Sequence, residues 1–105
     1  MTRKRPVRKM SKAMAAKLRE YRLQKLAYLV AARCRHVLCP VFPEQPVVDV
    51  HHTRGRSGRL LLMEEFWIAV SRRGHRWIHD HPAEARRAGL LCALGEWNTM
   101  PKDKS

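Results

Sequence analysis

The sequence predicts an α+β fold in which a long basic helix precedes a small unit of two short strands and a helix. Three observations support this. Residues 12–32 contain no glycine or proline and are rich in alanine, leucine, lysine and arginine, which are strong helix formers. Two short runs, 47–52 and 66–70, carry the β-branched and aromatic residues that favour strands. Residues 72–79 then suit a short helix.

The N-terminal helix is expected to span residues 11–33 and to pack on or beside the rest of the fold. Ser11 is a suitable N-cap, because its hydroxyl can accept a hydrogen bond from a free backbone N–H of the first turn. Residues 1–10 are basic and contain Pro6, so we expect a flexible basic arm there. At the other end, residues 92–105 are expected to form a C-terminal tail with a frayed end. Residues that can pack this part of the chain are Leu90, Leu91, Leu94 and Trp97.

The folded unit is expected to span residues 34–91. Residues 34–46 hold three prolines and predict a loop, and the glycine-bearing stretch 53–59 predicts a basic loop between the strands. Pro82 fits the first position of another helix, because its missing N–H would be unpaired there anyway. His81, directly before it, is expected to be that helix's N-cap.

Length and charge indicate one small domain with a polyanionic partner. The chain has 105 residues, with 22 lysines and arginines against 9 acids, and a net charge of +13. Such an excess would repel itself in a compact fold, and nucleic acid is its usual partner. Twelve of the 22 basic residues lie in positions 1–35, with the single acid Glu20. We therefore expect the N-terminal third to contact DNA phosphates.

Other features indicate the compartment. No apolar run approaches the ~20 residues that span a bilayer, so no membrane role is expected. The basic N-terminus has no apolar segment directly after it, which argues against a signal peptide, although its acid-poor composition is also compatible with a transit peptide. Three cysteines, an odd number, argue against a secreted disulfide framework. A reducing, cytoplasmic setting is the prediction.

Four of the six histidines fall into two compact groups that could form one metal site. His51 and His52 end the first predicted strand, and His75 and His79 lie four apart, so they share one face of the predicted helix. Three imidazoles could hold one divalent ion (Mg, Mn, Ni or Zn) and leave coordination positions open, as catalytic sites do. A fourth could act as a general base. Asp49 could orient a ligand imidazole, or be a simple strand-edge carboxylate.

These segments resemble the HNH endonucleases, a family with the ββα-metal (His-Me finger) fold, and especially its small phage-encoded members. The resemblance covers residues 34–91. It rests on Asp49-Val50-His51-His52, Arg54-Gly55-Arg56, Trp67 and the stretch His75-Arg76-Trp77-Ile78-His79-Asp80-His81-Pro82.

The resemblance implies a function and a role for each histidine. His51, His75 and His79 would hold one metal ion, and His52 would be the general base that activates water. The implied reaction is hydrolysis of a DNA phosphodiester bond, which leaves a 5′-phosphate and a 3′-hydroxyl. The implied setting is the cytoplasm of a bacterial host, and the implied partner is a phage packaging or recombination protein.

The chain departs from the family at two places. The family usually has an asparagine nine residues before the first helix histidine, where it helps to orient the general base; here that position is Phe66. Many relatives also hold a structural zinc with two cysteine pairs. Cys34 and Cys39 match the first pair, but Ser71 and Gly74 stand where the second would be. We therefore expect at most a residual zinc knuckle.

Basic side chains near the predicted base are candidate DNA contacts, because guanidinium groups can hold phosphates bidentately. A solvated basic loop is the alternative for the arginines of residues 53–59. Trp67 and Trp77 are expected in the core rather than stacked on bases. The candidate contacts are Arg54, Arg56 and Arg59 in the loop, and Arg3, Lys4, Arg5, Arg8 and Lys9 in the arm.

Two other functions stay open. A non-catalytic or partner-activated DNA-binding protein that retains the fold would explain both Phe66 and the incomplete knuckle. A zinc finger formed by Cys34, Cys39, His75 and His79 is disfavoured, because its two ligand pairs would be 36 positions apart rather than about a dozen.

Overall fold

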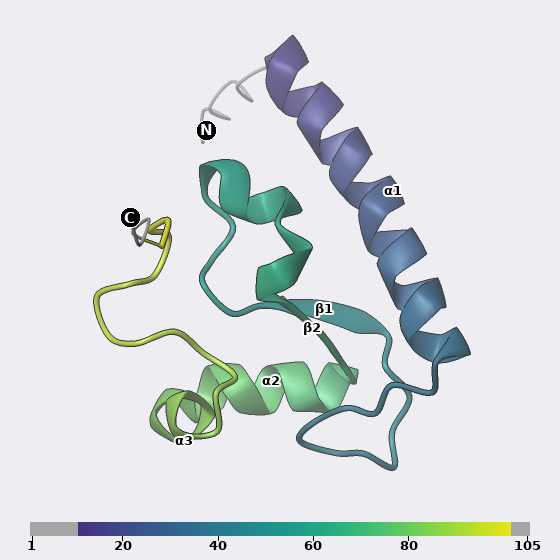
Figure 1. Cartoon of the computed structure of the whole chain (residues 1–105), viewed down its shortest axis with the longest axis vertical. Helices are drawn as coiled ribbons and strands as arrows, with labels where there is room; N and C mark the ends of the chain where they lie inside the picture. Colours follow the sequence, from purple (N-terminus) through teal and green to yellow (C-terminus); the bar gives the residue numbers. More distant parts are fainter. Residues whose placement is uncertain (1–10, 102–105) are drawn as a thin grey trace, which may run out of the picture.

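The computed structural model describes residues 11–101, which form an α+β fold (Figure 1). Within these residues there are three α-helices and a two-stranded antiparallel sheet, so the α+β part of the fold prediction is confirmed. The predicted basic arm lies outside the described residues. The elements are α1 (Lys12–Cys34), β1 (Asp49–His52), β2 (Trp67–Val70), α2 (Arg72–Asp80) and α3 (Pro82–Arg87), with the short 3-10 segments η1 (Gly58–Leu62) and η2 (Glu64–Phe66) between the strands.

Helix α1 begins where the sequence predicts, and it runs along one side of the molecule (Figure 1). The Ser11 hydroxyl accepts a hydrogen bond from the Met14 backbone N–H at 3.1 Å, as expected of an N-cap. Tyr21 and Ala32 are buried where the helix packs against the rest of the protein, whereas Leu23 and Leu26 are exposed to solvent. None of the helices in residues 11–101 combines the length and apolar character that crossing a membrane requires.

Strands β1 and β2 form a short hairpin, in which Asp49 pairs with Val70 and His52 with Trp67. The first strand is two residues shorter than its sequence predicts, and Val47 is instead buried in the core. Helix α2 lies below the hairpin in Figure 1. Because successive strand residues point to opposite faces, β1 can send His51 toward one side of the sheet and His52 toward the other.

The two faces of the hairpin each contribute to a hydrophobic cluster. One cluster contains Val70, Ile78 and Ala85 and joins the sheet to α2 and α3. The other contains Tyr21, Val50, Leu61 and Trp67 and joins the sheet to α1 and η1. Trp67 is therefore a core residue, as predicted.

Trp77 and His81 match the sequence prediction in part: Trp77 packs against the core cluster of Val70 and Ile78, and His81 precedes α3. Trp77 is half-buried, and its ring stacks on that of His81, with centroids 4.8 Å apart and an interplanar angle of 19°. His81 occupies the N-cap position of α3, but its side chain makes no capping hydrogen bond there. Its Nδ1 instead lies 3.1 Å from the Trp77 carbonyl oxygen at the end of α2, because the ring turns back over the indole.

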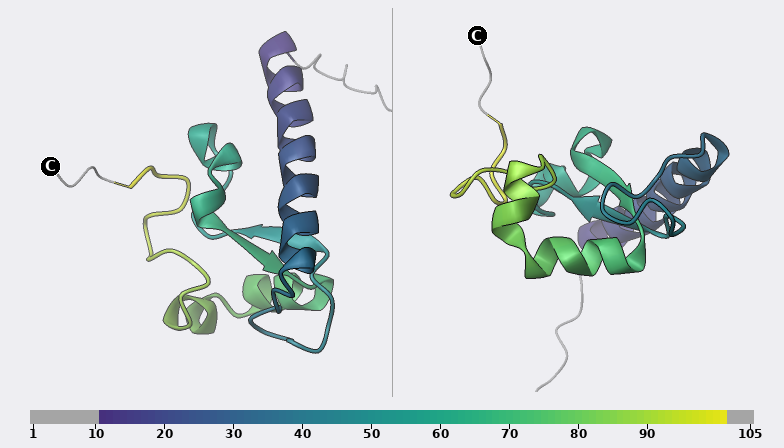
Figure 2. Two further views of the ribbon diagram at one scale, coloured as in Figure 1. Left: turned by 45° about the vertical axis from the view of Figure 1, so that its right-hand side comes forward. Right: turned by 90° about the horizontal axis from the view of Figure 1, so that it is seen from below.

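The segment after α3 is held against the loop that follows β1. We call residues 92–99 the C-terminal strap. The Cys92 N–H donates to the Thr53 carbonyl at 2.9 Å, and the Asn98 N–H donates to the Arg54 carbonyl at 2.7 Å. In both views of Figure 2 this segment lies on the side of the hairpin opposite α1. Leu94, which the sequence offered as a packing residue, is 80% exposed.

Candidate metal centre

Three histidines converge between β1 and α2. One ring nitrogen from each of His51, His75 and His79 lies within 4.8 Å of the other two. The Nε2 atoms of His75 and His79 are 3.2 Å apart. Two nitrogens bound to one zinc at 2.0–2.1 Å in tetrahedral geometry would be about 3.3 Å apart, so this pair has the separation of two ligands of one ion.

Local structure explains why these side chains meet. His75 and His79 are one turn apart on α2, whose start is fixed by Ser71. The Ser71 Oγ accepts from the Gly74 N–H at 2.9 Å. His51 reaches the same place from the adjacent strand; its ring centroid lies 5.4 Å from that of His75 and 6.0 Å from that of His79.

Hydrogen bonds to the far side of two rings decide which nitrogens face the cluster. The Nε2 of His51 lies 2.7 Å from the Leu90 carbonyl oxygen, which can only accept, so this Nε2 carries the proton and Nδ1 has the free lone pair. The Nδ1 of His75 lies 2.8 Å from Asp49 Oδ2 and donates to it, so the lone pair of this ring is on Nε2, which faces His79 Nε2. Outer partners of this kind orient the histidines of known metal sites. The three residues present therefore fit a divalent ion.

Asp49 has a second partner that the sequence did not reveal. The Lys25 ammonium of α1 lies 2.9 Å from Asp49 Oδ1. Burial alone would raise the pKa of Asp49, but the hydrogen bonds from Lys25 and His75 lower it to about 2. The carboxylate is therefore ionised at neutral pH and able to accept from His75.

His51 itself is kept neutral. Its side chain is buried, and burial lowers its pKa to about 4, with the neighbouring His75 and His79 acting in the same direction. A neutral imidazole keeps a lone pair for a metal ion, so burial favours the ligand form of His51 at neutral pH.

His52 lies on the other face of β1, packed among aromatic rings. Its ring centroid is 5.6 Å from that of Tyr21 on α1 and 5.5 Å from that of Trp67 on β2. Its Nε2 is buried and has no hydrogen-bond partner in the described part of the chain. Burial, and then the positive charge of Arg56, lower its pKa to about 4. Two aromatic rings therefore flank this imidazole.

One cavity of about 260 Å³ adjoins both the three candidate ligands and His52. All four histidines line it, so the three candidate ligands and the unpartnered His52 share one space. Val50 and a set of charged and aromatic side chains complete its wall; this set is Tyr21, Lys25, Asp49, Arg56 and Trp97.

The three loop arginines have different surroundings. Arg56 is exposed at the cavity, with its guanidinium 5.2 Å from the centroid of the Tyr21 ring. Arg59 is also exposed. Arg54 instead turns to the C-terminal strap, where it donates to the Thr99 carbonyl at 2.9 and 3.1 Å and pairs with Glu96 at 3.0 Å. Its donors are occupied by protein, so we leave Arg54 out of the DNA contacts proposed below.

Phe66 lies at the side of this loop. Its ring is 5.6 Å from the Arg54 guanidinium carbon, and its carbonyl accepts from the Thr53 N–H at 2.8 Å. Position 66 thus supports the loop that carries the arginines.

The positions of the suspected zinc knuckle are packed without forming a metal cluster. Cys39 is buried and Cys34 is exposed at the end of α1. Ser71 Oγ lies 3.4 Å from Cys39 Sγ, and a Cβ added at Gly74 would come within 2.5 Å of that sulfur. Ser71 and Gly74 therefore pack against Cys39 where a second cysteine pair would stand. Among residues 11–101, the one group able to hold a metal ion is the histidine cluster.

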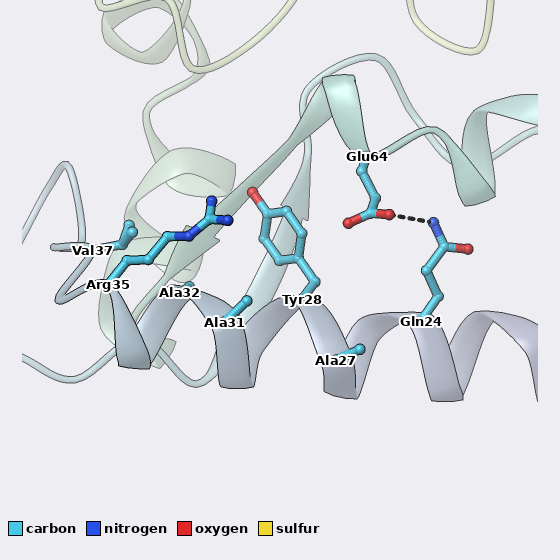
Figure 3. A pocket seen from close by; sticks show the side chains of 8 residues that line it. All are labelled: Gln24, Ala27, Tyr28, Ala31, Ala32, Arg35, Val37 and Glu64. Atoms are coloured by element: carbon cyan, nitrogen blue, oxygen red, sulfur yellow. Dashed lines mark hydrogen bonds between the residues drawn. The ribbon is translucent and has the colours of Figure 1, made fainter.

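A second cavity, of about 320 Å³, lies between α1 and the η2 segment (Figure 3). Gln24 donates to Glu64 across it at 3.0 Å, and the Tyr28 hydroxyl donates to the Trp67 carbonyl at 3.1 Å. Alanines form much of the remaining wall, and the lining contains no histidine or cysteine. The Tyr28 bond joins α1 to β2 at this cavity, and the lining offers no group comparable to the histidine cluster.

No family model, curated protein or solved structure was found to match the chain. The site must therefore be judged on its own geometry. Sequence reasoning named all four histidines and Asp49 but missed Lys25, Tyr21, the Leu90 carbonyl and Trp97. The Tyr-x-x-x-Lys spacing on α1 shows that Tyr21 and Lys25 share a face, but no pattern links that face to the histidines.

Proposed function

We propose that the protein is a metal-dependent endonuclease that hydrolyses DNA phosphodiester bonds, with β1, β2 and α2 forming a ββα-metal core. One observation carries the proposal. Three imidazoles with converging ring nitrogens share a cavity with a fourth, neutral imidazole whose Nε2 has no partner in the described residues. Histidine serves in proteins both as a metal ligand and as a proton acceptor, so three of these residues can bind the ion while the fourth acts as the base. The +13 net charge favours DNA as the substrate.

Each residue would have a defined task. A divalent ion bound by His51, His75 and His79 would supply positive charge against the phosphate oxygens. Arg56 and Lys25 would help to hold the phosphate in the cavity. His52 Nε2 would accept a proton from the attacking water as its oxygen bonds to phosphorus. The bond from phosphorus to the 3′-oxygen then breaks, and that oxygen takes a proton from solvent, which leaves a 5′-phosphate and a 3′-hydroxyl.

The alternative is a DNA-binding protein that cleaves only with a partner, or not at all. The observation that favours it is the enclosure of His52, whose side chain is only 6% exposed between Tyr21 and Trp67. Water must reach its Nε2 for hydrolysis, so a DNA- or partner-induced opening would be needed. A phage packaging or recombination protein in a bacterial cytoplasm is the kind of partner that the resemblance to HNH endonucleases suggests.

The test is cleavage of supercoiled plasmid in magnesium, manganese, nickel or zinc, with EDTA as the metal-free control. His52→Ala should abolish cleavage and retain metal and DNA binding, whereas His79→Ala, on an exposed position, should weaken metal binding and cleavage together. His36→Ala changes an exposed histidine outside the cavity and should cleave as the parent does. Cleavage by His52→Ala at the parent rate would overturn the assignment of the base. Metal and DNA binding without cleavage under any condition would support the alternative.

A further inference from the structure

The cavity of the histidines has an aromatic wall that the proposed chemistry does not use. Trp97 of the C-terminal strap lines this cavity and is 46% exposed. It also lines the adjacent hollow of about 210 Å³, together with His51 and His79. The other two tryptophans are occupied: Trp67 is buried in the core, and Trp77 stacks on His81.

The residues on both sides of Trp97 are held by contacts to the loop that follows β1. The next residue, Asn98, accepts through its Oδ1 from the backbone N–H groups of Arg56 and Ser57, at 3.1 and 3.2 Å. On the preceding side, Glu96 pairs with Arg54. These contacts fix both neighbours of the tryptophan to the loop beside the cavity.

The loop is shaped to receive the strap. Gly55 has a φ of +100°, and a Cβ added there would lie 2.1 Å from Asn98 Oδ1. Only glycine accommodates both this backbone conformation and the close approach of the amide. The chain that carries this partly exposed indole is thus anchored on both sides of it, so the segment is in place at the cavity before any ligand arrives.

We propose that Trp97 is a stacking platform for a nucleobase next to the phosphate held at the histidines. This inference rests on the proposed function, because it places the substrate in the same cavity. In a regular duplex each base face is covered by its neighbours, so only an unstacked base can stack on an indole. The preferred substrate is therefore DNA with an unpaired nucleotide, such as a single strand, a frayed end or a distorted duplex. Arg56 and Lys25 would contact the backbone on either side.

The expected effect is selective for single strands. Removing an aromatic platform costs about 1–3 kcal/mol per stacked base, which corresponds to a loss of roughly 5- to 150-fold in affinity. Trp97→Ala should show a loss in this range for a single-stranded oligonucleotide, and less than about a two-fold change for a regular duplex. Trp97→Phe keeps an aromatic face and should retain most of the affinity.

The experiment measures anisotropy of a labelled twelve-nucleotide thymidine strand and of a twelve-base-pair duplex, in EDTA, with the full chain. Trp77→Phe is the matched control, because that ring lies outside the cavity. Thermal unfolding followed by circular dichroism confirms that each variant is folded. Equal weakening toward both DNAs, or no change in Trp97→Ala, would overturn the proposal.

A parallel cleavage assay separates this inference from the proposed function. If no DNA is cleaved in any metal, the nuclease proposal fails, whatever the binding result. If the parent cleaves both substrates and Trp97→Ala keeps the same ratio of single-strand to duplex cleavage, the nuclease proposal stands and the stacking platform is refuted. A ratio that falls in Trp97→Ala and recovers in Trp97→Phe supports both.

Discussion

Stability should fall as the pH drops below about 6.5, because β1 buries two neutral histidines. An unfolded chain protonates histidine near pH 6.5, whereas burial lowers the pKa of both His51 and His52 to about 4. Between these values the unfolded state binds more protons than the folded state, so acid favours unfolding. The stabilisation is fully present above pH 6.5 and is lost as the pH falls toward 4.

The size of the effect follows from the same values. A pKa that drops from 6.5 to about 4 corresponds to about 3 kcal/mol for one histidine. This is a large fraction of the total stability of a small domain, ~5–15 kcal/mol. Asp49 contributes at lower pH, because its pKa is lowered to about 2 and its stabilisation is lost only below about pH 4. The window from 6.5 to 4 therefore reports mainly on the two histidines.

The assay is urea unfolding followed by far-UV circular dichroism between pH 7 and pH 4.5, in EDTA. His52→Phe is the informative variant, because phenylalanine can occupy the space between Tyr21 and Trp67 and cannot take up a proton. It should lose about half of the pH dependence. His36→Ala, which changes an exposed histidine, should follow the parent curve. A His52→Phe curve with the slope of the parent would refute the reasoning for this residue.

Three further predictions concern the partners of the site. Asp49→Asn should weaken metal binding about 10- to 100-fold, because the carboxylate orients His75; isothermal titration measures this, and Glu44→Gln, on the surface, should bind as the parent does. Arg54→Ala should lower the free energy of unfolding by about 1–3 kcal/mol through the lost strap contacts; unchanged stability in urea unfolding would contradict this. Deleting residues 1–10 should flatten the dependence of log affinity for DNA on log salt by about 0.9 per lost phosphate contact; an identical slope would exclude the arm as a contact.

The elements that the sequence predicts well are those with local causes. Ser11 caps α1 through a bond three residues away, and Pro82 begins α3 because proline suits the first helical position. The sequence also predicts that His75 and His79 lie side by side, because residues four apart on one helix share a face. The α+β class follows from the same short-range signals.

The parts that could not be predicted depend on contacts between distant residues. Arg54 meets Thr99, 45 residues later, through a backbone carbonyl, which has no signature in sequence. The Lys25 contact with Asp49 requires knowing which face of α1 meets the hairpin. The aromatic surroundings of His52 were hidden for the same reason, since Tyr21 lies on α1 and Trp67 on β2.

The route of the strap has a practical consequence for anyone who prepares this protein. Because the strap carries Trp97 to the histidine cavity, an affinity tag fused C-terminal to the strap would be tethered to a segment that lines the site. A polyhistidine tag placed there would bring extra imidazoles that compete for the same divalent ions. Purification through a removable tag without metal-binding side chains would keep the metal stoichiometry interpretable.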